Sequence, residues 1–271
     1  MVYQTFIFIK HHTIMPTPTA SFWKDRFKAS GIHLGLSLTI ALLAALLVFG
    51  LWYPYPYREI SGGRELFLLV VAVDVILGPL ITLAVFNRKK PLAELRRDLA
   101  IVVLIQLGAL GYGLWTVFVA RPVHMVFEYG SFRVVHAIDI PPELLPQTPP
   151  DVNALPLTGP TLLGLRPFHN DKEKMEATLV ALQGVSLSAR PDLWQSYAKS
   201  VPEILLAAKP VAQLKARFAE QAAEIDRVLA DAGRTAETTV YVPLAGRKSF
   251  WTVILDPVTA QVVATMPLDS F

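Results

Sequence analysis

Long runs of apolar residues dominate the first 120 positions of the chain. They cover residues 31–53, 65–86 and 99–120. As a helix rising ~1.5 Å per residue, each run is long enough to cross a hydrocarbon core ~30 Å thick. The pattern therefore predicts a transmembrane domain of three α-helices over residues 31–120, preceded by an N-terminal segment of residues 1–30.

The pattern changes after residue 120. Polar and apolar residues alternate over 122–136 around a turn at Tyr129-Gly130-Ser131, which predicts a β-hairpin. Residues 141–167 contain eight prolines and are expected to form an irregular connector. Periodicity and capping residues then predict helices over 171–183, 191–200 and 210–233, and strands over 238–246, 248–256 and 260–268. The chain is thus expected to end in an α+β domain over residues 121–271.

Basic residues give the expected orientation in the membrane. Three lie in residues 24–28 and five in the loop 87–98, whereas the loop between the first two runs contains only Arg58 and Arg64. The positive-inside rule places the N-terminus and the 87–98 loop in the cytoplasm. Residues 121–271 then lie outside, in the periplasm of a Gram-negative cell. A signal peptide followed by two spans is the alternative, but the first run ends in aromatic residues and lacks a small-residue cleavage pattern.

The first residues of the chain allow two interpretations. Residues 1–14 are apolar, without a period, and too short to span a bilayer. Met15 opens a segment with a more ordinary composition. The sequence leaves open whether the protein begins at Met1 or at Met15.

Composition and charge narrow the class of protein. The chain is 53% hydrophobic and 17% charged, which is too apolar for an ordinary soluble protein. Its net charge of +3 comes from basic residues beside the apolar runs, so it indicates membrane topology and not a nucleic-acid partner. Cysteine is absent, which excludes disulfides, thiolate metal sites and thiol nucleophiles.

Residues 121–271 carry no recognisable catalytic motif. There is no G-x-S-x-G, Walker loop or H-E-x-x-H sequence. His124, His136 and His169 are scattered and lack metal-ligand spacing. The sequence therefore predicts a protein that is not an enzyme and that needs no metal or cofactor.

The second apolar run contains a carboxyl group that membrane helices rarely carry. Asp74, Gly78 and Thr82 are four residues apart and share one helix face. A central Asp costs roughly 2.5–3.5 kcal/mol on insertion scales, so it persists where it faces protein, pairs or is protonated. Pro79 removes a backbone hydrogen bond and is expected to free the carbonyl of Val75. This face is predicted to be small, polar and irregular.

The other two runs carry matching residues. His33 and Ser37 recur at helical spacing in the first run, and Gln106 and Gly113 in the third. These positions either pack the three helices together or receive the helix of another protein, and the two roles are compatible. An intramembrane aspartyl protease needs two carboxylates, and Asp98 lies only at a boundary. We therefore do not expect intramembrane hydrolysis.

Several segments resemble a known family. They are FKASGIHLGLSL at the first span, WYPYPY at its exit, VDVILGPLITLAVF in the second span, DLAIVVLIQLGALGYGLWTVFVARP through the third, and RPDLWQSYAK beyond it. The segment that runs through the third span ends in the membrane-exit pair Arg121-Pro122. The chain is similar, over roughly residues 27–271, to the type IV pilin accessory proteins of the TfpX/TfpZ type.

The resemblance implies a multi-pass protein of the bacterial inner membrane that stabilises a specific type IV pilin or modulates its assembly into pili. Its expected partners are the pilin subunit, the lipid bilayer and, as a further candidate, the pilus assembly machinery. Pilin helices of this class carry an acid near their start. His33, Gln106 or Tyr112 could satisfy that acid by hydrogen bonding, and Asp74 only if protonated. The alternative function is a membrane-anchored sensor with a ligand-binding periplasmic domain, although the cytoplasmic parts contain no output domain.

Overall fold

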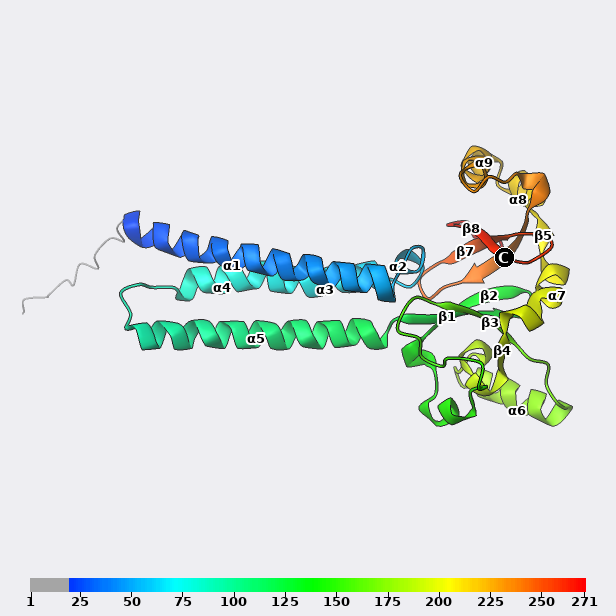
Figure 1. Ribbon diagram of the computed structural model, residues 1–271, viewed down its shortest axis with the longest axis horizontal. Helices are drawn as coiled ribbons and strands as arrows, with labels where there is room; N and C mark the ends of the chain where they lie inside the picture. Colours follow the sequence, from blue (N-terminus) through cyan, green and yellow to red (C-terminus); the bar gives the residue numbers. More distant parts are fainter. Residues whose placement is uncertain (1–19) are drawn as a thin grey trace, which may run out of the picture.

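The computed structural model of the chain describes residues 20–271, with side chains from Trp23 onward. Residues 1–14 and Met15, where the sequence leaves the start open, lie outside the described residues. Figure 1 shows two parts: a bundle of long helices at one end, and a domain of strands and shorter helices at the other. The part that follows the last long helix is called the C-terminal domain below.

Three helical runs form the bundle. The first joins α1 (Ala20–Leu47) to a π-helical turn at Val48–Trp52. The second contains α3 (Gly63–Ala72), a π-helical turn at Val73–Leu77, and α4 (Gly78–Val85). The third is α5 (Leu92–Val119). All three are long and apolar enough to cross a membrane, which makes the chain a multi-pass membrane protein as predicted.

The C-terminal domain is built on an eight-stranded mixed sheet, in agreement with the predicted fold class. Its order is β4-β3-β1-β2-β6-β7-β8, and β5 pairs with β6. The predicted hairpin is present as antiparallel β1 (Pro122–Glu128) and β2 (Ser131–His136). Strands β3 (Thr161–Leu165) and β6 (Val240–Ala245) pair in parallel with β1 and β2, respectively. The remaining strands are β4 (Trp194–Ser196), β5 (Lys209–Pro210), β7 (Phe250–Leu255) and β8 (Val262–Met266).

Three predictions for this domain were wrong in detail. The connector is not irregular throughout, because Thr161–Leu165 adds to the sheet beside β1. The helix expected over 191–200 begins only at Tyr197, as α7 (Tyr197–Ala207), because buried Trp194 lies in strand β4. The helix expected over 210–233 is broken at Phe218 into α8 (Val211–Arg217) and α9 (Ala222–Asp231), since Phe218 has non-helical backbone angles.

Helices cover both faces of the sheet. Ile204 of α7 packs with Val242 and Val253, whereas Leu214 of α8 packs with Ile254 on the opposite face. Alternate residues of a strand point to opposite faces, so the central strands are apolar on both sides. Helix α6 (Asp171–Leu182) is capped by Asn170, whose side chain accepts a hydrogen bond from the backbone N–H of Glu173.

The bundle and the C-terminal domain touch at one end. Helix α2 (Tyr57–Ile60) lies in the loop between the first two runs, and the Lys248 backbone N–H donates to the Ile60 carbonyl at 3.0 Å. Lys248 also forms an ion pair with Glu65. Strand β1 starts directly after α5, so it runs away from the bundle and places its turn with β2 at the far end of the molecule (Figure 1).

Candidate functional site

A groove opens in the bundle, in the half remote from the C-terminal domain. Its volume is about 380 Å³. One wall is α1, from Ala29 to Ile40, the other is α5, from Leu99 to Leu110, and the second helical run forms the floor. Near the C-terminal domain, by contrast, Val48, Phe67 and Val117 join all three runs in an apolar cluster. Figure 1 shows α1 and α5 diverging away from that cluster. We call the groove lined by these two helices and the second run the membrane groove.

The floor of the membrane groove is polar. Asp74 and Thr82 of the second run line it together with Gln106, which reaches Asp74 from α5; these three residues are called the polar floor. The Gln106 Nε2 amide donates to Asp74 twice, to the main-chain oxygen at 3.1 Å and to Oδ1 at 3.1 Å. His33 Nδ1 lies 2.5 Å from Thr82 Oγ1. Four of the predicted polar residues thus form two hydrogen-bonded pairs that line one groove, His33 with Thr82 and Gln106 with Asp74.

Pro79 explains why the backbone of Asp74 needs a partner. The residues before it, Val73–Leu77, are π-helical, and in this register an N–H bonds to the carbonyl five residues earlier. Pro79 has no N–H, so it leaves the carbonyl of Asp74 without a helical donor. The Gln106 Nε2 amide donates to this carbonyl in place of the missing backbone N–H. An α-helical register had predicted that the carbonyl of Val75, four residues before Pro79, would lack a donor. In the π-helical register the carbonyl that lacks a donor is that of Asp74, five residues before Pro79.

Glycine makes the close approach of these helices possible. A Cβ atom at Gly78 would lie 1.9 Å from Gln106 Nε2, and one at Gly113 would lie 2.4 Å from Val70 Cγ1. A real Cβ atom does not approach another atom this closely, so a larger residue at either position would have to displace the neighbouring side chain, Gln106 or Val70. The expected bundle-packing role of these two residues thus has a direct steric basis.

One polar atom of Gln106 lacks a hydrogen-bond partner among the described residues. This atom, Oε1, is buried. An unsatisfied acceptor at membrane depth is costly, and a donor from another molecule would remove that cost. The membrane groove therefore favours an occupant that is apolar but brings one hydrogen-bond donor.

The remaining predicted residues of the spans fall in two groups. Ser37 is buried and lines the membrane groove. Tyr112 is 75% exposed on α5 and does not line the groove.

Two contacts that were not predicted from the sequence also hold the bundle together. Ser30 Oγ donates to the Pro79 carbonyl at 2.9 Å, and Tyr53 Oη donates to the Val117 carbonyl at 3.1 Å. Ser30 lies one turn before His33, so the period of the polar stripe could have revealed it.

The membrane-exit pair, Arg121 and Pro122, lies at the junction between α5 and β1. Arg121 is 4% exposed, and its guanidinium donates to the carbonyls of Phe118 and Pro156 at 2.9 and 3.3 Å. It also stacks over the Phe118 ring. Pro122 then begins β1. The pair thus connects the end of α5 to the connector and to the first strand.

The three histidines of the C-terminal domain are held by protein groups. His124 contacts Thr161 Oγ1 and the Ala154 carbonyl, His136 contacts Asp139, and His169 contacts Glu173. Burial lowers the pKa of His124 to about 4, so this imidazole is neutral at pH 7. Within residues 20–271, no group of three metal-ligating side chains lies close enough to hold a metal ion.

Comparison with known proteins places the chain among assembly factors. A family model described as fimbrial assembly protein FimB matches residues 21–62. The chain is 38% identical to the serogroup I fimbrial assembly protein of Dichelobacter nodosus over 254 residues, which is 92% of this chain and 98% of that protein. The serogroup E1 protein of the same organism is 37% identical over 254 residues, again 92% of this chain and 98% of the relative.

A shorter relative, the protein of serogroups C1 and C2 in D. nodosus, is 45% identical over 128 residues, which is 46% of this chain and 98% of that protein. No solved structure matches the chain. The two long relatives exceed 30% identity over nearly their whole length. The chain therefore belongs to the fimbrial assembly protein family.

Proposed function

We propose that the protein stabilises a specific type IV pilin in the inner membrane, or modulates its assembly into pili, without acting as an enzyme. Its relatives are fimbrial assembly proteins, and the segments quoted above resemble the TfpX/TfpZ-type pilin accessory proteins. The single observation that supports the mechanism is the membrane groove with its polar floor. The pilin helix is the occupant of that groove.

The chemistry of the groove suits such a helix. Its walls present exposed apolar side chains, including Leu36, Val103 and Leu107. Along α1 the wall runs from Ala29 to Ile40, roughly 17 Å at ~1.5 Å per residue, about half of a hydrocarbon core. Apolar walls accept an apolar helix by close packing, and Gln106 Oε1 accepts a hydrogen bond from a protonated acid or a hydroxyl group on it.

The orientation of the chain follows the basic residues. The N-terminus and the 87–98 loop are cytoplasmic, and the C-terminal domain is periplasmic. The membrane groove then lies in the cytoplasmic half of the bilayer, because it is remote from the C-terminal domain. A pilin subunit waiting in the inner membrane would have its helix beside the groove and its head beside the C-terminal domain.

Co-purification with the cognate pilin tests this proposal. The tagged full-length chain is extracted in mild detergent, and bound pilin is quantified for Asp74→Leu, Gln106→Leu and Val103→Trp. Val103→Trp is the sharpest variant, because it fills the groove and leaves the hydrogen bonds of the polar floor in place. Tyr112→Leu is the matched control, since Tyr112 is exposed on the same helix outside the groove.

We expect all three groove variants to reduce pilin recovery several-fold and Tyr112→Leu to leave it unchanged. Thermal unfolding of each purified variant verifies that the bundle is intact. Normal pilin recovery with folded Val103→Trp would contradict the proposal and leave the polar floor with a packing role only.

A further inference from the structure

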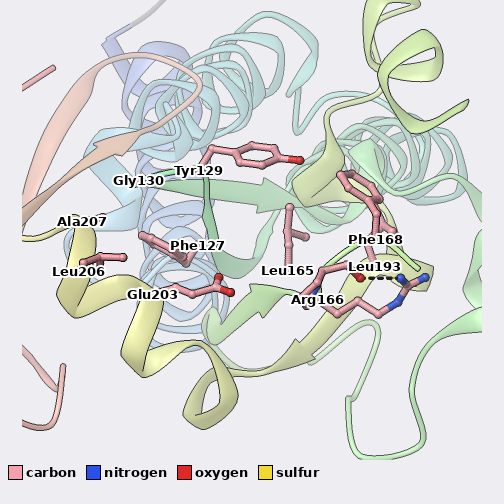
Figure 2. A pocket seen from close by; sticks show the side chains of 11 residues that line it. Phe127, Tyr129, Gly130, Leu165, Arg166, Phe168, Leu193, Glu203, Leu206 and Ala207 are labelled. Atoms are coloured by element: carbon pink, nitrogen blue, oxygen red, sulfur yellow. Dashed lines mark hydrogen bonds between the residues drawn. The ribbon is translucent and has the colours of Figure 1, made fainter. Parts of the chain in front are cut away.

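A second cavity lies in the C-terminal domain, at the end turned away from the bundle (Figure 2). Its volume is about 470 Å³, within the range of pockets that hold small ligands or side chains of a partner. We call it the distal pocket. It is formed by the β1–β2 turn, the end of β3 and the end of α7; the residues that matter here are Phe127, Tyr129, Arg166, Leu193, Glu203 and Leu206.

The distal pocket has a buried apolar base and an exposed apolar rim. Leu193 and Phe127 form the base and are almost fully buried. Tyr129 and Leu206 stand at the rim and are 71% and 89% exposed. Exposed aromatic and aliphatic side chains around a preformed hollow are typical of protein interaction sites.

Tyr129 is held in an unfavourable conformation at this rim. Its φ is 44°, and Gly130 follows with φ 86°. A two-residue hairpin turn with both φ angles positive is type I′, which strongly prefers Asn-Gly. A bulky aromatic residue in the left-handed region is costly, and such outliers cluster at binding sites. Figure 2 shows the ring extending from the turn toward Phe168, along one side of the pocket.

Of the two charged residues that line the pocket, Arg166 and Glu203, only Arg166 forms hydrogen bonds and an ion pair among the described residues. Arg166 is fully engaged: Nη2 and Nη1 donate to the two carboxylate oxygens of Glu173 at 2.6 and 3.2 Å, and Nε donates to the Asp192 carbonyl at 3.1 Å. The hydrogen bonds from Arg166 hold the pKa of Glu173 near 2, so this pair stays ionised. Glu203 has no ion pair or hydrogen bond among the described residues. The uncompensated charge at the pocket is therefore negative.

We propose that the distal pocket docks one apolar side chain, carried next to a Lys or Arg, on the external head of the fimbrial subunit. The apolar side chain enters between Tyr129 and Leu206, and the neighbouring cation pairs with Glu203. This inference rests on the proposed function, because a subunit whose helix lies in the membrane groove presents its head beside the C-terminal domain. The membrane groove would then hold the helix of the subunit while the distal pocket selects its head.

Binding of the soluble subunit head tests the proposal separately from the membrane groove. The probe is the cognate fimbrial subunit without its N-terminal apolar helix, titrated onto the full-length chain in lipid nanodiscs. Tyr129→Asn removes the ring while giving the turn its preferred residue, so loss of binding cannot come from a weakened hairpin. Glu203→Lys reverses the charge in the pocket. Glu220→Lys makes the same change at an exposed acid that does not line it.

We expect Tyr129→Asn and Glu203→Lys each to weaken head binding about tenfold or more. The effect of Glu203→Lys shrinks at high salt, because an exposed charge pair is screened. Glu220→Lys and the groove variant Val103→Trp should leave head binding within about twofold, a change too small to indicate a lost contact.

Three results would overturn the inference. The first is equal binding of the head by all variants. The second is a wild-type chain that co-purifies with the intact subunit but does not bind its head, a result that leaves the proposed function standing. The third is loss of self-association in the pocket variants with head binding unchanged, which would make the pocket an interface between copies of this chain.

Discussion

Gln106 on α5 and Asp74 on the second helical run are joined by two hydrogen bonds from a single amide nitrogen. Nε2 lies 3.1 Å from the Asp74 carbonyl and 3.1 Å from its carboxylate Oδ1. The bond lies where Pro79 interrupts the helix, so one polar side chain replaces a missing backbone donor and pairs a buried acid. This contact ties two membrane helices together below the groove.

Replacing the glycine beside this contact should displace the Gln106 side chain from Asp74. Gly78→Val places a side chain where Gln106 now lies, because even a Cβ would be 1.9 Å from Nε2. We expect a loss of about 1–3 kcal/mol in the free energy of unfolding, as for other overpacked sites. Thermal unfolding in detergent measures it. Gly108→Val on α5 is the control, since nothing lies within 4 Å of a Cβ there, and an equal loss in both variants would refute the steric argument.

A double-mutant cycle tests whether Gln106 and Asp74 act as a pair. Gln106→Leu leaves the carboxyl and carbonyl of Asp74 unpaired, and Asp74→Leu removes one of two acceptors. Hydrogen bonds between membrane helices typically contribute ~0.6 kcal/mol and up to ~1.7 kcal/mol. We expect the double variant to be more stable than the sum of the single effects predicts, with a coupling of about 1 kcal/mol. Strict additivity in the measured unfolding free energies would show that the two residues act independently.

The stability of the C-terminal domain should depend on pH through His124. Burial holds its folded pKa at about 4, against about 6.5 in an unfolded chain. Between these values the unfolded state binds a proton that the folded state does not, so stability falls as pH falls from 6.5 toward 4 and is constant above that window for this group. The full effect is about 3 kcal/mol.

Denaturation monitored by tryptophan fluorescence measures this effect; Trp194, one of the five tryptophans, has its ring centroid 4.5 Å from that of His124. Burial lowers the pKa of His136 as well, so it contributes with the same sign. His124→Gln should therefore reduce the slope between pH 5 and 6.5, and a second replacement, His136→Gln, should flatten it further. An unchanged slope in His124→Gln would show that the pH dependence arises elsewhere.

The orientation inferred from the basic residues predicts where each end of the chain lies. A periplasmic reporter such as alkaline phosphatase should be active when fused after Phe271 and inactive when inserted at Lys89 in the 87–98 loop. A reporter that works only in the cytoplasm should give the reverse pattern. Cytoplasmic activity after Phe271 would place the C-terminal domain inside the cell and remove the proposed contact with the pilin head.

The bundle could be predicted from the sequence because the signals for it are local. Hydropathy alone locates the three runs, and four-residue spacing brings Asp74, Gly78 and Thr82 to one face. Gln106 could be placed on its helix but not paired with Asp74, because the pairing depends on how the helices cross. The π-helical register at Val73–Leu77 was also hidden, because hydropathy and residue spacing do not distinguish a π-helical turn from an α-helical one.

The C-terminal domain was less predictable for the same reason. The hairpin of β1 and β2 was found from its Tyr129-Gly130 turn, which is a local signal. Strand β3 was missed, because its place in the sheet comes from parallel pairing with β1 about thirty-seven positions earlier, as in the pair His124–Thr161. The distal pocket combines residues from a turn, a strand end and a helix end, so no spacing in the sequence predicts it.

A crosslink in the membrane groove tests most directly whether the groove holds the pilin helix. The chain has no cysteine, so single cysteines report without background. Ile40→Cys lies in the groove, whereas Leu42→Cys points away from it on the same helix. We predict that Ile40→Cys forms a disulfide with a cysteine placed in the apolar helix of the cognate pilin and that Leu42→Cys does not. Equal crosslinking at both positions, or none at Ile40 while pilin still co-purifies, would contradict the claim that the groove holds that helix.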